Sequence, residues 1–264
     1  MSKEYIVNFD LSPYDSLDKF ALLADQKYNL GDKDDWFGCF RGGLYGFYAR
    51  LMGIQIHFKA VHSWDFSTKT GLEEYHISSI FFNMDSAVEC MVFALNALGY
   101  IACSSKFLDI TDEKKLKEIS PSNLLNPKKM TQGYDDYFPS LKKCWHENND
   151  LLSLIFEQHD VSKHRSTIYV GGQKRIDPPS GFFEMLGLQD DKVKQVPFMP
   201  MAEILIPPNR KVPLQKRKHI ALKDIPKLED IAEKFCEFIN TCGVNALADA
   251  KTNIKLKHCE FVNP

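Results

Sequence analysis

The run from Leu72 to Ala102 constrains the fold more than any other part of this chain. It is apolar on nearly every face, with few polar interruptions such as Glu89 and Asn96. A helix that is apolar all round has to be buried on most of its surface, so it belongs in the middle of a group of helices. Its longest apolar stretches, such as Ala87 to Leu98, are shorter than the roughly 20 apolar residues that cross a bilayer. We therefore expect a central core helix and no membrane span.

Further segments have apolar residues at helical spacing. Gly42, Gly43 and Gly46 interrupt one of them, where they either lower the helix propensity or mark close helix packing. Another carries an i, i+3, i+4, i+7 stripe formed by Leu141, Cys144, Trp145, Asn148, Leu151, Leu152, Ile155 and Phe156. The predicted helices are Asp15 to about Lys27, Asp35 to about Val61, Tyr137 to about Arg165 and Pro226 to about Ala248, with a short helix from Thr111 to Ile119.

Residues 166–223 differ in character from the helical segments. Ser166 to Ile176 is β-branched and aromatic around a glycine pair, and Met201 to Ile206 reads as a short strand stopped by two prolines. Pairing between these segments predicts a small antiparallel sheet. Because no internal repeat or low-complexity linker divides the chain, we expect one domain over 1–264. It is mainly α, a bundle of four or five long helices with a helical core at 14–165, a C-terminal helix at 226–248 and the β-containing insert at 166–223.

Composition places the chain among globular proteins and limits the chemistry of its sites. Its 33 basic and 35 acidic residues give a net charge of −2, which argues against a surface built throughout to bind nucleic acid. The 7 cysteines are irregularly spaced and form no C-x-x-C pair, which favours reduced thiols and predicts no metal site. The first ten residues lack the apolar block of a secretory signal, so we expect a cytoplasmic protein. We also expect no cofactor.

The segment from His159 to Arg165 concentrates more reactive groups than any other, and we refer to it as the 159–165 cluster. On a helix, Asp160 and His164 are four residues apart and share a face, so the carboxylate would orient the imidazole as in an acid–base device. Lys163 and Arg165 would neutralise a phosphate, and His159 adds a second proton carrier. The alternative is structural, because basic residues and histidines favour the negative C-terminal end of a helix.

Two weaker candidates lie elsewhere in the chain. The segment from Pro208 to Lys223 is basic without a single acidic residue, which suits either phosphate binding or a solvated loop. Near the junction of two predicted helices, His57, His62 and His76 would need folding to complete a metal site, and packing is the simpler interpretation. The candidate phosphate- or RNA-binding residues are Lys163, Arg210, Lys211, Lys216, Arg217 and Lys218.

The pattern His159-Asp160-x-x-x-His164 on a long helix resembles the signature of the HEPN superfamily, in which an arginine precedes a histidine by four to six residues. His164 matches the family's histidine and Asp160 matches the polar residue after the arginine, while His159 takes the place of the arginine itself. The resemblance covers Leu72 to Arg165. It implies a helical bundle that dimerises, and either a metal-independent ribonuclease or a non-catalytic relative that binds RNA or nucleotides.

Three hypotheses about function follow. The first is a non-catalytic or divergent RNA- or nucleotide-binding module, which the missing arginine favours. The second is a metal-independent endoribonuclease of the toxin or defence type, in which His164, His159, Asp160 and Arg165 are the catalytic residues. The third is a structural scaffold without a nucleic-acid role. RNA or a nucleotide is the expected partner, together with a homodimer.

Overall fold

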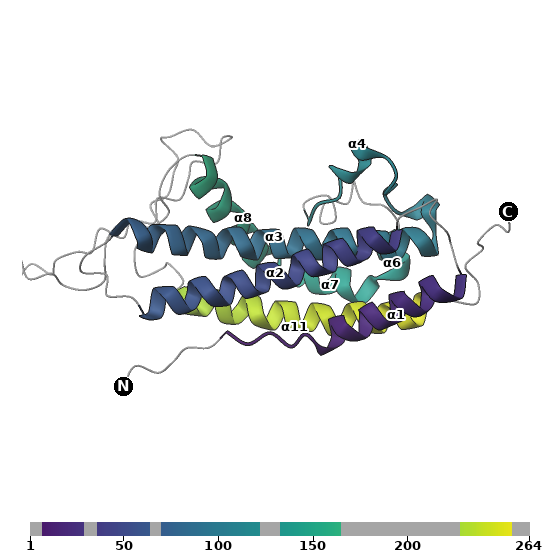
Figure 1. Cartoon of the computed structure of the whole chain (residues 1–264), viewed down its shortest axis with the longest axis horizontal. Coiled ribbons are helices and arrows are strands. Elements are labelled where there is room, and N and C mark those ends of the chain that lie inside the picture. Colours follow the sequence, from purple (N-terminus) through teal and green to yellow (C-terminus); the bar gives the residue numbers. More distant parts are fainter. Residues whose placement is uncertain (1–6, 29–35, 64–69, 122–132, 165–227, 255–264) are drawn as a thin grey trace, which may run out of the picture.

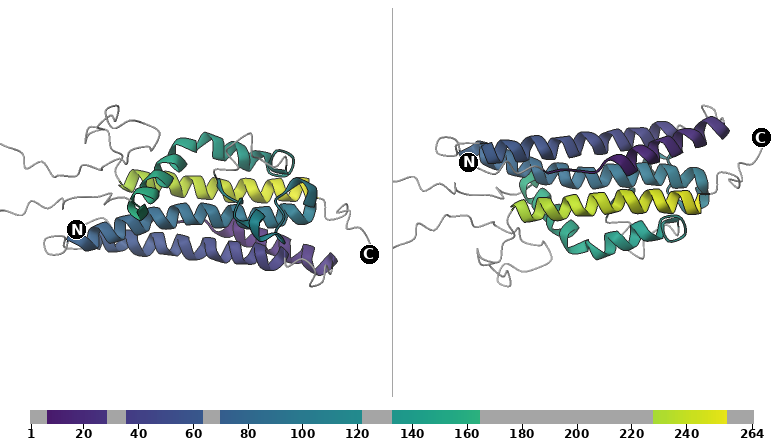
Figure 2. Two further views of the ribbon diagram at one scale, coloured as in Figure 1. Left: turned by 90° about the horizontal axis from the view of Figure 1, so that it is seen from above. Right: turned by 90° about the horizontal axis from the view of Figure 1, so that it is seen from below.

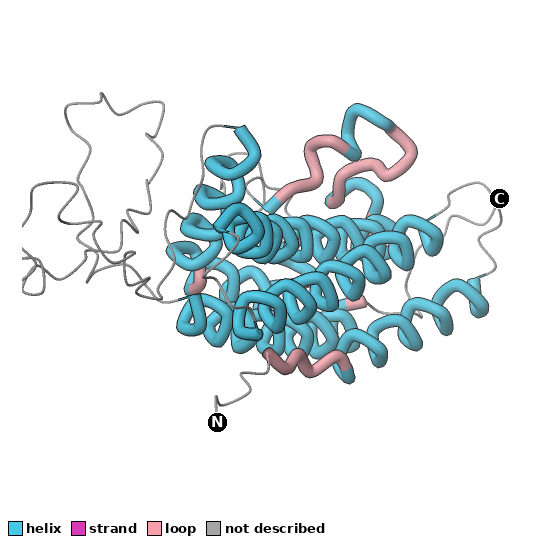
Figure 3. Tube along the Cα trace, turned by 60° about the vertical axis from the view of Figure 1, so that its left-hand side comes forward, coloured by secondary structure: helices cyan, strands magenta, loops and turns pink. Residues whose placement is uncertain are grey.

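The computed structural model describes residues 7–28, 36–63, 70–121, 133–164 and 228–254, and most of these residues are helical (Figure 3). Within the described ranges no residue is in a strand, which confirms the mainly α class. The predicted β insert at 166–223 lies outside the described residues. The helices are α1 (Ser12–Tyr28), α2 (Trp36–Ser63), α3 (Thr70–Ala102), the 3₁₀ turn η2 (Ser104–Lys106), α4 (Glu113–Leu116), α6 (Gly133–Tyr137), α7 (Pro139–Glu147), α8 (Asn149–His164) and α11 (Leu228–Asn253).

The long helices lie side by side along the longest axis of the molecule (Figure 1). In both views of Figure 2, α3 lies between α2 and α11, and α7 flanks α11 on the outer side. Helix α1 contacts both α2 and α11, whereas α8 contacts α3. A buried hydrogen bond fastens α1 to α11, since the Tyr14 hydroxyl donates to the Ile239 carbonyl at 2.7 Å. All of these helices share one hydrophobic core.

Helix α3 is the central helix that its apolar sequence predicts. From Ile80 to Leu98 most of its apolar side chains are buried, and even the polar Asn96 is only 1% exposed. Asn96 is satisfied because its amide exchanges two hydrogen bonds with the backbone of Leu108, at 2.9 and 3.1 Å. By length and composition the stretch Tyr75–Ala102 would also suffice to cross a membrane, but 67% of its most apolar window is buried inside the protein. Most of that window therefore packs against other parts of the protein.

Gly43 and Gly46 of α2 mark close packing against α3, as one of the two sequence interpretations holds, whereas Gly42 faces open space. A Cβ atom on Gly43 would lie 2.8 Å from the backbone nitrogen of Ala94 and 2.9 Å from the backbone oxygen of Cys90. On Gly53 it would lie 2.6 Å from the amide oxygen of Asn83. Without side chains at Gly43 and Gly53, the axes of α2 and α3 can lie close together. Arg50 lies between these two glycines in sequence, and its guanidinium contacts the ring of Phe82 on α3.

The single long helix predicted from Tyr137 to about Arg165 is wrong, because Tyr137 ends α6 and the following residues are divided into α7 and α8. Pro139 opens α7 at its first turn, and Asn148 ends it in a non-helical conformation with φ −105° and ψ 16°. The Asn148 side chain also donates to the Cys144 carbonyl at 2.8 Å, which competes with a continuing helix. Beyond the break, Phe156, predicted to be in the core, is 55% exposed, whereas Leu152 and Ile155 of the same stripe are buried.

The described cysteines are free thiols, which agrees with the prediction from their spacing. Cys144 on α7 and Cys242 on α11 lie with their sulfur atoms 3.8 Å apart, and the Trp145 indole donates to the Cys242 sulfur at 3.2 Å. Burial raises the pKa of the Cys242 thiol well above its ordinary value. This thiol therefore stays protonated and packs as a small apolar group.

Candidate functional site

The 159–165 cluster begins on the last two turns of α8, where that helix contacts α3. Its first residue, His159, has a partner on another helix, since its Nδ1 atom lies 2.6 Å from Oδ2 of Asp85 on α3. The two side chains are 12% and 11% exposed, so the pair is largely removed from solvent. A carboxylate 74 positions away in sequence therefore orients this imidazole.

The geometry of this pair fixes the roles of the two ring nitrogens of His159. A carboxylate oxygen accepts, so Nδ1–H donates to Asp85 and the proton on a neutral ring stays at Nδ1. Nε2 is then the basic nitrogen, and within the described residues no group forms a hydrogen bond with it. This is the arrangement of a histidine that exchanges protons through Nε2 while a carboxylate holds the ring in place.

An arginine that sequence reasoning overlooked lies close to the same pair. The ring of Phe82 on α3 packs edge-on against His159, with the ring centroids 5.3 Å apart. The guanidinium carbon of Arg50, from α2, lies 5.4 Å from the centroid of that same Phe82 ring. The Arg50 Nε atom is buried and has no hydrogen-bond partner among the described residues. Phe82 therefore contacts both His159, which Asp85 orients, and Arg50. Arg50 has no carboxylate partner in the described part of the chain.

Glu89 continues the polar line along α3, one helical turn beyond Asp85. Partial burial raises the pKa of Glu89, and the nearby Asp85 carboxylate raises it further. His159 and Lys163 act in the opposite sense, which places both of these α8 groups within electrostatic reach of Glu89. Acidic side chains of α3 therefore lie opposite basic side chains of α8 at this boundary.

A cavity of about 310 Å³ opens between α3 and α8 beside this pair. Asp85 and Glu89 line it from α3, and the turn at Ser120 and Pro121 closes one side. Its remaining lining residues are Val88 from α3 and Asn149, Leu152, Ser153, Ile155 and Phe156 from α8. This volume lies at the lower end of the range of small-molecule sites, about 300–1,000 Å³.

The other predicted site residues are only partly placed by the structure. His164 is the last residue of α8, and its side chain lies outside the described part of the molecule, as do Arg165 and the basic residues Arg210, Lys211, Lys216, Arg217 and Lys218. Lys163 is exposed and Asp160 is half-buried on α8. The Asp160–His164 and Arg165 roles implied by the motif therefore stay predictions.

Of the three histidines considered for a metal site, two are brought together. The Nδ1 atoms of His57 on α2 and His76 on α3 lie 2.9 Å apart, which requires one ring to donate and the other to accept. Burial and the neighbouring His76 lower the pKa of His57, so the neutral ring is favoured. Among the described residues no group of three or more histidine, cysteine or acidic side chains is placed to hold a metal ion. The side chain of His62 lies outside them.

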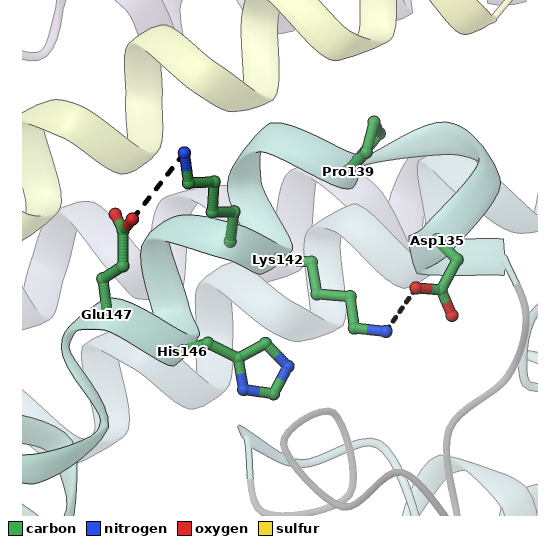
Figure 4. A pocket seen from close by; sticks show the side chains of 6 residues that line it. Asp135, Pro139, Lys142, His146 and Glu147 are labelled. Atoms are coloured by element: carbon green, nitrogen blue, oxygen red, sulfur yellow. Dashed lines mark hydrogen bonds and ion pairs between the residues drawn. The ribbon is translucent and has the colours of Figure 1, made fainter.

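A second hollow lies on the outer surface of α7 (Figure 4). Its charged side chains are already paired with one another, Lys142 with Asp135 of α6 and Lys143 with Glu147 at 3.8 Å. His146 projects into the same hollow from α7. Because each lysine there is already paired with a carboxylate, this surface is a weaker candidate for phosphate binding than Arg50.

Comparisons with protein-family models, with curated proteins and with solved structures found no match for this chain. The site is therefore defined by its own geometry. Asp85, Arg50 and Glu89 were missed because each lies on a helix distant in sequence from the 159–165 cluster. The polar residues in the otherwise apolar run of α3 were the available signal, since a buried carboxylate requires a partner.

Proposed function

We propose that this chain is an HEPN-like helical protein that binds RNA or nucleotides without a catalytic role. The proposed binding surface is formed by Arg50 on α2, Phe82 on α3, and His159 and Lys163 on α8. The HEPN assignment rests on the His159-Asp160-x-x-x-His164 pattern at the end of a long helix. The placement of that segment against a buried central helix is compatible with the bundle that the resemblance implies.

The observation that carries the proposal is the state of Arg50. A guanidinium presents five N–H donors, and a buried donor without an acceptor is unfavourable. Arg41 on the same helix shows the ordinary solution, since its guanidinium forms two hydrogen bonds to Asp18 at 3.0 and 2.9 Å. Arg50 has no such carboxylate within the described residues. A phosphate supplies the acceptors that a guanidinium binds best.

Neighbouring groups support the same kind of ligand. Lys163 is exposed one turn beyond His159, and both lie close enough to Glu89 to affect its pKa. Phe82 is 41% exposed, so part of its ring remains open to solvent. Exposed aromatic rings beside cations are features of single-stranded nucleic-acid sites, where bases stack and phosphates are neutralised. The basic residues between Pro208 and Lys223 would extend this surface, although they lie outside the described residues.

Arg50→Gln is expected to weaken the binding of a short fluorescent single-stranded RNA by about tenfold, because a charge-assisted contact to phosphate is lost. Fluorescence anisotropy at several salt concentrations measures the RNA dissociation constant of each variant. The salt dependence of the binding constant should also become less steep, since one fewer counterion is released.

Arg41→Gln is the matched control for this measurement. It removes a cation from the same helix, but one whose charge is already compensated by Asp18. Binding by this variant should stay within about twofold of the wild type. If both variants bind RNA equally well, or if the wild type binds neither RNA nor a nucleotide, the binding proposal is wrong and the structural scaffold is the better description.

The Asp85–His159 pair favours a second candidate function, a metal-independent endoribonuclease. In that reaction His159 Nε2 would remove the proton from a ribose 2′-hydroxyl. The 2′-oxygen would then bond to the adjacent phosphorus as the bond to the 5′-oxygen breaks. A second proton carrier, for which His164 is the family's candidate, would protonate the leaving oxygen. Arg50 would stabilise the additional negative charge of the phosphorane-like transition state.

If this second function holds, purified protein cleaves RNA in the presence of EDTA and leaves a 2′,3′-cyclic phosphate. His159→Gln and His164→Ala are then each expected to reduce the rate at least about a hundredfold, since each removes a proton carrier. Asp160→Ala tests the motif's own orienting residue in the same assay. Circular dichroism establishes that the variants are folded. An uncleaved RNA that is nevertheless bound favours the non-catalytic proposal.

The homodimer implied by the resemblance is also part of the proposal. Helix α2 lies at one edge of the molecule (Figure 2) and carries Tyr45, Met52 and Ile56 on its outer side. These three side chains are 52%, 61% and 59% exposed. Ala49 completes the same exposed stripe, in which the residues follow at steps of four, three and four without a charge. A stripe of this spacing is typical of a helix that packs against a second helix.

A further inference from the structure

The cavity between α3 and α8 is lined by two chemically different parts. Val88, Leu152 and Ile155 provide apolar walls that are themselves well buried. The carboxylates of Asp85 and Glu89 lie on the α3 side, while Asn149 and Ser153 contribute neutral polar groups from α8. Among the described residues that line it there is no lysine, arginine or histidine. An anion such as phosphate is therefore disfavoured inside, whereas an apolar group that carries N–H donors is favoured.

Glu89 is the most available of these acceptors. Asp85 already accepts from His159, but Glu89 has no hydrogen-bond or ion-pair partner among the described residues. The amide of Asn149 offers both donors and an acceptor to a ligand. Phe156 lies at the edge with 55% of its surface exposed, and an exposed aromatic ring beside a cavity offers a stacking face to a planar ligand.

We propose that this cavity binds a nucleobase, and that it selects a base that carries an exocyclic amino group. The inference rests on the proposed RNA or nucleotide ligand, whose phosphate would contact Arg50 or Lys163 outside the cavity. The amino group donates to the Glu89 carboxylate. The ring lies against the apolar walls and Phe156. A base with a carbonyl oxygen in place of the amino group would direct that oxygen at a carboxylate, which is repulsive.

Adenosine and purine riboside provide the sharpest test, because they differ only in the 6-amino group and neither carries a phosphate. Isothermal titration of the full chain should show adenosine binding about tenfold or more tightly than purine riboside, as expected when a hydrogen bond to a charged acceptor is made in one case only. Equal affinities for the two nucleosides, or no binding of either at millimolar concentration, would overturn the inference.

Glu89→Ala tests the residue assigned to the amino group. It should reduce the preference for adenosine over purine riboside to about twofold or less, because the carboxylate that distinguishes them is removed. Glu157→Ala is the control, since Glu157 is exposed on α8 and does not line the cavity. If the adenosine preference survives in Glu89→Ala, the assignment is wrong.

The nucleoside experiment is independent of the phosphate site. If RNA binding depends on Arg50 but the wild type does not distinguish the two nucleosides, the proposed function stands and the cavity assignment fails. If adenosine is preferred through Glu89 while Arg50→Gln leaves RNA binding unchanged, the cavity assignment stands and the phosphate contact fails.

Discussion

Gly43→Ala is expected to destabilise the protein by about 3 kcal/mol, near the upper end of the range for overpacking a buried contact. The added methyl group would lie 2.8 and 2.9 Å from backbone atoms of Ala94 and Cys90 on α3. Backbone atoms of a buried helix cannot turn aside as a side chain can, so α2 and α3 would have to separate along their whole contact. Urea unfolding followed by circular dichroism measures the change in the free energy of unfolding.

The adjacent glycine is the matched control, because the same substitution there has the opposite expected sign. A Cβ atom on Gly42 meets nothing within 4 Å, since this residue lies on the outer face of α2. Gly42→Ala should therefore stabilise the protein by up to about 1 kcal/mol through the higher helix propensity of alanine. Similar effects of the two substitutions would contradict the packing of α2 on α3 described above.

Asp249→Ala is expected to destabilise the protein by about 2–3 kcal/mol, because the Asp249 carboxylate on α11 accepts hydrogen bonds from the N-terminus of α7. Helix α7 begins after Phe138, whose side chain provides no cap. Asp249 from α11 replaces that cap, since its Oδ2 atom accepts from the backbone N–H groups of Ser140 and Leu141 at 2.8 and 3.0 Å. The Leu141 donor is buried and would lose its partner.

Asp249→Asn separates the hydrogen bonds from the charge. An asparagine keeps a carbonyl oxygen that can accept from the same donors, so less than half of the loss is expected. Urea unfolding measures the free energy of both variants, and amide hydrogen exchange at Leu141 reports on the cap itself. If the asparagine variant is as unstable as the alanine variant, the negative charge near the N-terminus of α7 is the dominant contribution instead.

Much of the helical framework could be predicted because helix formation here is encoded locally. The predicted segments Asp35 to about Val61 and Leu72 to Ala102 match α2 and α3 within a few residues, and Pro226 to about Ala248 matches α11 except for its last turn. Their apolar residues repeat at helical spacing over many turns, and such a pattern has few alternatives. The close contact between α2 and α3 was also one of the two interpretations of Gly43 and Gly46.

The division of the predicted helix at Tyr137 shows where that local information ends. The apolar stripe continues through Asn148, so periodicity alone predicts one helix. Asn148 ends α7 through hydrogen bonds to Cys144, and α8 then turns to contact α3. A hydrogen bond of this kind contributes only roughly 1 kcal/mol, so the local sequence leaves the two conformations close in free energy.

The sequence by itself determined a mainly helical protein with α3 at its centre, and it identified the 159–165 cluster as chemically unusual. Only the tertiary structure decided what His159 interacts with. Its partner Asp85 lies 74 positions earlier, and Arg50 reaches the same neighbourhood from a third helix. Helical periodicity reports which face of each helix is buried, because burial repeats along the chain. It carries no information about which polar residue on one helix meets which on another, since that depends on how the helices are aligned when they pack.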